Sequence, residues 1–177
     1  PMYFLIGIWG GPRRRYAAIK FFVYTNIASL VMFIGFMMLV IGLPVNSFGL
    51  PEISQSLAAG ELGNFFWLPA DTLALVAFVA MFIGFAVKVP VVPVHTWLPD
   101  AHVEAPTPVS VMLAGVLLKM GTYALLRYNY TMLPAQAEYF AVPIAIIAVV
   151  SVIYGAMLAL AQEDLKRIVA YSSVSSM

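Results

Sequence analysis

Cysteine is absent from this chain of 177 residues, and charged residues make up only 10% of it. Without thiols, the chain itself can form no disulfide, perform no thiol catalysis and ligate no iron–sulfur cluster. Its nine lysines and arginines are scattered and nearly balanced by eight acidic residues, so no basic surface for nucleic acid can be assembled from them. The sequence also contains no nucleotide-binding loop and no pattern typical of a Ser/His/Asp triad.

Hydrophobic residues make up 63% of the chain and form runs long enough to cross a bilayer. We therefore predict an all-α, polytopic transmembrane helix bundle. The runs predict full spans at about 17–43, 108–127 and 141–161, a broken span at 71–97, and partial spans at 1–9 and 165–177. Residues 44–69 are expected to form an extramembrane loop with a short helix at 52–59. Because the sequence starts with proline and stops within a helical pattern, we expect residues 1–177 to be one internal fragment of a larger membrane protein.

The broken span joins a lysine to two prolines. Lys88 ends a long apolar run, and Pro90 and Pro93 follow it directly. Proline removes a backbone donor and clashes with the preceding turn, so we predict that both prolines interrupt the helix. In hydrocarbon, an interrupted helix beside a charge is stable only inside protein or beside a polar cavity. Membrane transporters build ion sites from such elements.

Two lysines, Lys88 and Lys119, are predicted to lie within spans. A lysine at membrane depth costs roughly 2.5–3.5 kcal/mol unless its stem snorkels to the interface, an alternative that is open for both residues. Every carboxylate falls in a loop or at a span end, so none is placed to neutralise them. Each lysine is then neutral part of the time or paired with an acid outside the chain, and a loosely held proton suits a proton relay. Gly84 and Gly115 precede the two lysines by one turn, where another helix could approach closely.

His95 follows the break and is the third candidate for proton translocation, as a protonatable group on the wall of a cavity. The alternative, a histidine that hydrogen-bonds to carbonyls freed around Pro90, is equally open. Asp100, His102 and Glu104 lie nearby in sequence, but the spacing matches no zinc pattern, so we predict no metal site. His102 and Glu104 are expected in an interfacial loop.

The distribution of basic residues indicates the orientation of the chain. If the spans alternate, the loops at 13–15, 97–104 and 162–167 share one side. That side carries Arg13, Arg14, Arg15, Lys20, Lys166 and Arg167. The opposite side carries Arg127. This bias predicts that the shared side is cytoplasmic.

Several long motifs resemble those of a known family. They are the segments 1–10, 88–102, 105–107, 113–123 and 162–175. The chain looks like the M-type antiporter-like membrane subunit of complex I, the proton-pumping NADH:quinone oxidoreductase, a family with Mrp-type antiporter relatives. The M-type assignment depends on Lys119, because the related L-type subunits carry a histidine-containing His-Ala-Ala-Thr pattern in that helix.

The resemblance implies inverted helical repeats that each contain one interrupted helix. It implies that Lys88 and Lys119 are the proton-carrying lysines, and that an acidic partner of Lys88 lies upstream of Pro1. It also implies a departure, because Ser176 stands where many members have a histidine, which puts that relay step in doubt. Quinone, flavin and iron–sulfur clusters are expected in partner subunits and none in this chain. The implied partners are the other membrane and peripheral subunits of complex I, together with the lipid bilayer and protons.

Three functions remain open at the level of sequence. The first is proton translocation in a redox-driven complex, the second is a stand-alone cation/proton antiporter, and the third is a transport-inactive assembly subunit. His95 favours the first over the second, and the two lysines disfavour the third. The expected location is a prokaryotic cell membrane, with the mitochondrial inner membrane as the alternative. The sequence leaves the electron donor open between NADH, ferredoxin and a deazaflavin.

Overall fold

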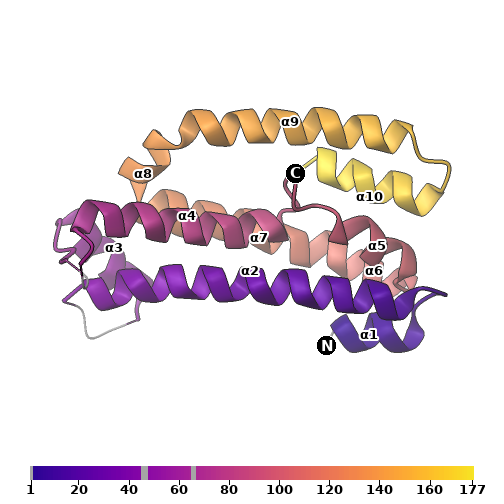
Figure 1. Cartoon of the computed structure of the whole chain (residues 1–177), viewed down its shortest axis with the longest axis horizontal. Helices are drawn as coiled ribbons and strands as arrows, with labels where there is room; N and C mark the ends of the chain where they lie inside the picture. The colour runs from indigo at the N-terminus through magenta and orange to yellow at the C-terminus, as the bar shows by residue number, and fades with distance from the viewer. Residues whose placement is uncertain (1, 45–47, 65–66) are drawn as a thin grey trace.

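The computed structural model describes residues 2–44, 48–64 and 67–177, and it confirms an all-α bundle built on long, roughly parallel helices (Figure 1). Within these residues, four helices are long and apolar enough to cross a membrane. They are α2 (Arg14–Gly42), α4 (Ala70–Lys88), the continuous helix 107–130, and α9 (Ala141–Leu160). Shorter helices at their ends are α1 (Met2–Trp9), α3 (Leu50–Ala58), α8 (Pro134–Tyr139) and α10 (Leu165–Ser175).

Small residues bring α2 and α4 into close contact at the centre of the bundle. A Cβ atom on Gly84 would lie 2.5 Å from the Met32 Cβ atom, and one on Gly35 would lie 2.9 Å from the Ala80 Cβ atom. Only a residue without a side chain fits at such a distance, so the two helices pack backbone to backbone. For Gly84, the predicted close approach of another helix is therefore confirmed.

The interrupted helix divides into α4 and α5 (Trp97–Glu104), which are separated by residues 89–96. The break lies at the two prolines, as predicted. The loop expected at residues 97–104 is wrong, because these residues form α5. His102 and Glu104 are also not in an interfacial loop: their exposed fractions are 5% and 8%, since α5 packs against α2 and α10.

The helix 107–130 is longer than the predicted span 108–127. It consists of α6 (Thr107–Met112), a π-helical turn η1 (Leu113–Leu117), α7 (Leu118–Ala124) and a second π-helical turn η2 (Leu125–Tyr130). Between the predicted spans 108–127 and 141–161 the sequence also predicts a loop at 129–138, and this is wrong over most of its length, because η2 extends into it and Pro134 starts α8. Proline is tolerated in a first helical turn, where its missing N–H has no partner to lose. Residues 45–47 and 65–66 of the predicted loop 44–69 lie outside the described part of the chain.

Three turns meet at the end of the bundle where α5 ends. The Gly11 N–H donates to the Glu104 carbonyl oxygen at 2.9 Å, and the Arg13 N–H donates to Glu104 Oε2 at 2.9 Å. Lys166, in the first turn of α10, donates to the Val103 and Ala105 carbonyl oxygens at 3.4 and 3.3 Å. Gly11 and Lys166 thereby satisfy carbonyls that the end of α5 leaves without helical partners, and Arg13 binds the Glu104 carboxylate. The three loops predicted to share one side of the membrane therefore lie at the same end of the bundle.

Candidate functional site

The break in the interrupted helix is stabilised by a rearranged set of backbone hydrogen bonds. Pro90 has no N–H to donate to the Ala86 carbonyl, and the Val91 N–H takes its place at 2.9 Å. The Val87 carbonyl thereby loses Val91 as its helical donor. Trp97 supplies the missing donor, since its buried indole Nε1–H donates to the Val87 carbonyl oxygen at 2.9 Å. The first residue of α5 thus holds the carbonyl next to Lys88.

A second side chain reaches the break from α9. The Val92 N–H donates to Ser151 Oγ at 3.1 Å, and the Ser151 hydroxyl donates to the Ile147 carbonyl within its own helix at 2.8 Å. Ser151 is buried, with 6% of its surface exposed. Polar side chains therefore complete the backbone at the break, as the lack of water in hydrocarbon requires.

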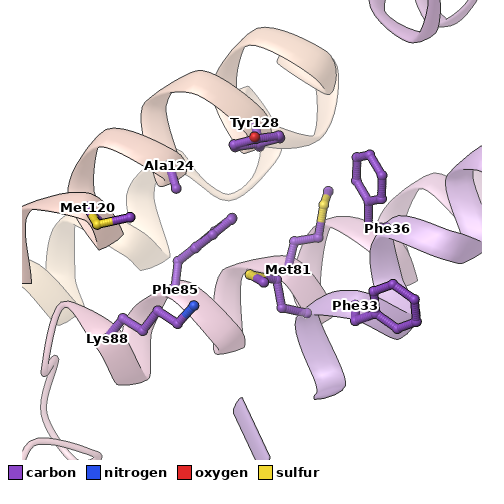
Figure 2. A pocket seen from close by; sticks show the side chains of 9 residues that line it. Phe33, Phe36, Met81, Phe85, Lys88, Met120, Ala124 and Tyr128 are labelled. Atoms are coloured by element: carbon purple, nitrogen blue, oxygen red, sulfur yellow. The ribbon is translucent and has the colours of Figure 1, made fainter. Parts of the chain in front are cut away.

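Lys88 ends α4 and lies where two cavities meet. The first has a volume of about 340 Å³ and is lined by α2, α4 and the helix 107–130. Apart from Lys88 its lining is almost entirely apolar and aromatic: Met32, Phe33, Phe36, Met81, Phe85, Met120, Ala124 and Tyr128. Figure 2 shows the Lys88 side chain extending into this cavity beside Phe85. An ammonium group finds no hydrogen-bond acceptor among aliphatic and aromatic carbons, apart from the face of a ring.

The second cavity, of about 230 Å³, lies on the other side of Lys88, towards Trp97. Thr25, Asn26 and Ser29 of α2 contribute polar side chains to its wall. Hydroxyl and amide groups can hold water next to the lysine amine. The polar surroundings of Lys88 therefore lie on the side of α5, and the apolar ones on the side away from it.

Lys119 does not line either of these cavities. It lies on an exposed face of α7, whereas Leu118 and Gly121 face inward. A Cβ atom on Gly121 would lie 3.1 Å from the Lys88 Cβ atom, so the inward face of α7 packs on the stem of Lys88. Gly115, one turn before Lys119, has nothing within 4 Å of its Cβ position. The close approach predicted at Gly115 is absent from the described residues.

His95 is buried between the break and the last two helices. Its exposed fraction is 6%, and its ring lies 5.6 Å from the Tyr154 ring and 6.4 Å from the Tyr171 ring, between centroids. Nδ1 is buried and has no hydrogen-bond partner among the described residues. His95 therefore packs against α9 and α10, and it does not line the two cavities around Lys88.

The acidic residues of α5 lie away from Lys88 and are occupied elsewhere. Asp100 Oδ2 accepts from Lys20 Nζ at 2.7 Å, and Glu104 accepts from the backbone of the α1–α2 turn. Neither carboxylate lines the two Lys88 cavities. Within the described residues, no group of three or more histidine, aspartate and glutamate side chains could hold a metal ion.

Sequence reasoning missed three polar groups that the fold buries: the Trp97 indole, Ser151 and Asn129. Asn129 is fully buried in η2 and its Nδ2 donates to the Phe78 carbonyl of α4 at 3.2 Å. Its Oδ1 has no partner in the described part of the chain. A polar residue within or beside an apolar run was the signal that could have found them, because such a group needs a hydrogen-bond partner in hydrocarbon.

Comparison with known proteins defines the family. The model of the NADH:quinone oxidoreductase/Mrp antiporter transmembrane family matches residues 1–177. The chain belongs to this family. It is part of a multi-pass membrane protein, in line with its four long apolar helices and with relatives from bacteria.

Two curated relatives carry names from the same group of enzymes. The chain is 49% identical to "NAD(P)H-quinone oxidoreductase chain 4 2" of Thermosynechococcus vestitus, over all of this chain and 31% of that protein. It is 44% identical to "NADH-quinone oxidoreductase subunit M" of Rickettsia bellii, over all of this chain and 34% of that protein. The M-type recognition is thereby confirmed. The chain spans about a third of the length of these relatives.

Two solved structures share the fold. A chain of respiratory complex I from Thermus thermophilus matches with a TM-score of 0.84 and 26% identity, over 99% of this chain and 35% of that chain. A chain of the Mrp complex from Dietzia sp. matches with a TM-score of 0.79 and 24% identity, over 99% and 31%. The second likeness concerns the fold alone.

Proposed function

We propose that this chain is part of a proton-translocating membrane subunit of a respiratory NADH:quinone oxidoreductase. The observation that carries the proposal is the position of Lys88, at the end of an interrupted helix between a polar and an apolar cavity. The names of the relatives support the same assignment, since two of them are quinone oxidoreductase subunits.

In this proposal Lys88 exchanges its proton with water held in the cavity beside Thr25, Asn26 and Ser29. An amine that is partly shielded from water can lose its proton, whereas a guanidinium group cannot. The apolar cavity on the other side disfavours the charged ammonium, so entry into it favours release. Lys88 can therefore alternate between a charged and a neutral form.

Lys119 and His95 have secondary roles in the proposal. Lys119 is exposed on the outer face of α7, where it can pass a proton laterally to a part of the protein outside this chain. His95, with an unpartnered Nδ1 beside two tyrosine rings, is a proton-exchanging group towards α9 and α10. A direct transfer between Lys88 and Lys119 would require a path around the packed inward face of α7.

Redox chemistry belongs to other subunits in this proposal. The residues present do not fit an iron–sulfur cluster, because the chain contains no cysteine thiolate. We place flavin, iron–sulfur clusters and the quinone that is reduced in partner subunits. Peripheral and membrane subunits are accordingly the expected partners of this chain.

The test replaces Lys88 in the full-length protein within its assembled complex. Lys88→Ala and Lys88→Arg should both lower redox-driven proton translocation in membrane vesicles by about tenfold or more, because neither side chain can gain and lose a proton. Lys88→His should retain more activity, since imidazole titrates near neutrality. Full translocation by Lys88→Ala at normal assembly would exclude Lys88 as the proton carrier.

The likeness of the fold to a chain of the Mrp complex keeps a stand-alone cation/proton antiporter as the second candidate. The two functions differ in their driving force. Translocation by an antiporter follows an imposed sodium gradient without any electron donor, whereas translocation by the proposed subunit requires electron transfer. Measuring proton uptake under each condition in the same vesicles separates them.

A further inference from the structure

The N-terminal half of α2 meets α5 along a row of three side-chain contacts, which we call the α2–α5 row. Lys20 Nζ donates to Asp100 Oδ2 at 2.7 Å, the Phe21 and Trp97 rings lie 5.6 Å apart between centroids, and Tyr24 Oη lies 3.3 Å from Thr96 Oγ1. Residues 20 and 24 are one turn apart on α2, and residues 96 and 100 are one turn apart at α5. The two polar contacts therefore lie on either side of the aromatic one.

The Lys20–Asp100 pair is the strongest contact of the row. The side chains are only 19% and 29% exposed, so water screens their attraction only in part. A short hydrogen bond between two ionised groups is about twice as strong as one between neutral groups. The other ion pair found among the described residues, Arg13–Glu104, is 3.8 Å long and its arginine is 60% exposed. Lys20 and Asp100 are thus the side chains that tie α5 most firmly to α2.

The middle of the row connects to Lys88. Trp97 packs on Phe21, and its indole nitrogen donates to the Val87 carbonyl oxygen, next to Lys88 in the chain. The break removes the regular hydrogen-bond ladder between α4 and α5, so this side-chain bond replaces part of it. A displacement of α5 would therefore change the position of the last turn of α4 and of its lysine.

We propose that Lys20 and Asp100 are positioning residues for Lys88. The pair holds α5 against α2, α5 holds the Trp97 indole on the Val87 carbonyl, and this bond keeps Lys88 between its two cavities. The proposal rests on the proposed role of Lys88 as the proton carrier. Lys20 lies near the arginine-rich turn, but in this proposal its role is to position Lys88 and not to act as one more surface charge.

The experiment compares variants of the full-length protein in its assembled complex. Lys20→Met and Asp100→Asn each leave one partly buried charge without its partner, Lys20→Arg keeps the pair, and the double variant Lys20→Met/Asp100→Asn removes both charges. Arg15→Met is the matched control, because it removes a positive charge from the same end of α2 at an exposed position. Two quantities are measured for each: amide hydrogen exchange of peptides covering 85–105, and redox-driven proton translocation per assembled complex.

Lys20→Met and Asp100→Asn should each speed exchange in 85–105 by about five- to tenfold and lower translocation by a similar factor. Lys20→Arg should restore both quantities, and the double variant should be no worse than either single one, because the two residues act as a pair. Arg15→Met should leave both at the level of the unmodified protein.

Three results would overturn the proposal. They are unchanged exchange in both single variants, faster exchange with normal translocation, and a double variant whose losses multiply. The Lys88→Ala variant keeps the two claims apart. Full translocation by Lys88→Ala would exclude the proposed role of Lys88. The exchange data for the Lys20 and Asp100 variants test the α2–α5 row independently of that result.

Discussion

Lys88 and Lys119 have similar positions in the sequence but different surroundings in the fold. Each follows a glycine by one turn within an apolar run, and this pattern predicts the close approach of another helix at both glycines. The glycine before Lys88 packs against α2, whereas the glycine before Lys119 has an open Cβ position. The sequence of one helix cannot show which face a second helix covers, because that depends on helices distant in the chain. The location of both lysines in membrane spans could therefore be predicted, whereas the difference in their exposure could not.

Replacement of Lys119 tests whether its exposed position still serves proton transfer. Lys119→Ala and Lys119→Arg should both lower redox-linked proton uptake in vesicles by about tenfold, because alanine offers no site and arginine stays protonated. Lys119→His should retain more uptake. A purely structural lysine would give the opposite order, with arginine tolerated and histidine poor. Assembly of each variant is checked by the amount of intact complex, and full pumping by Lys119→Ala would end the relay hypothesis for this residue.

Trp97→Phe isolates the hydrogen bond at the break. Phenylalanine keeps an aromatic ring beside Phe21 but leaves the Val87 carbonyl without its donor. An unsatisfied buried acceptor costs about 1–3 kcal/mol, so the free energy of unfolding of the full-length protein should fall by that amount in a denaturant titration. Trp9→Phe, at a position 64% exposed, is the control and should change it little. Equal effects of the two variants would show that the indole N–H contributes nothing specific.

In the interrupted helix, the position of the break is predictable from the local sequence, whereas the hydrogen-bond partners at the break are not. Pro90 and Pro93 predict the break because the loss of an N–H is a local property of the residue type. The partners of the freed groups were not predictable in the same way. Ser151 lies 59 residues further along the chain from Val92, and only the packing of α9 brings its hydroxyl to the Val92 N–H. Likewise, residues 97–104 form a helix although Pro99 and the polar residues of this segment are typical of a turn, because α2 and α10 cover it.

Contact between α2 and α4 depends on Gly84. An alanine there would place its Cβ atom 2.5 Å from the Met32 Cβ atom and 2.8 Å from the Ala28 carbonyl oxygen, so the helices would have to separate. Overpacking of this kind costs about 1–3 kcal/mol, and we expect Gly84→Ala to lower the unfolding midpoint in detergent and to disturb Lys88 one turn away. Gly115→Ala is the matched control, since its added methyl group meets nothing within 4 Å in the described residues. A comparable loss at Gly115 would mean that another helix of the full-length protein packs on the Lys119 face.

The whole bundle has two chemically different ends. One end gathers the turn at 10–13, α5 and the start of α10, linked by Glu104, Lys20 and Lys166. The other end carries α3 and α8, and Figure 1 shows these two helices together at the side opposite α5 and α6. The sequence predicted that the loops at 13–15, 97–104 and 162–167 share a side, because helices that span a membrane must alternate in direction. It could not predict that the Glu104 carboxylate would bind the turn at 10–13 and that backbone carbonyls at the end of α5 would bind Lys166, since α5 itself was not expected to be a helix.

The orientation of the two ends in the membrane is testable with single cysteines. The segment contains no native cysteine, so labels introduced here report on one site each once any cysteines elsewhere in the full-length protein are replaced. Arg15→Cys lies at an exposed position on the basic end, and Gln55→Cys lies at an exposed position of α3 at the other end. The excess of lysine and arginine at the first end predicts that it faces the cytoplasm. A membrane-impermeant maleimide applied to intact cells should therefore label Gln55→Cys and leave Arg15→Cys unlabelled until the cells are opened. Labelling of both sites from outside would contradict the alternating topology. Labelling of Arg15→Cys alone would show that the orientation is inverted. The polar cavity of Lys88 would then lie towards the opposite side of the membrane.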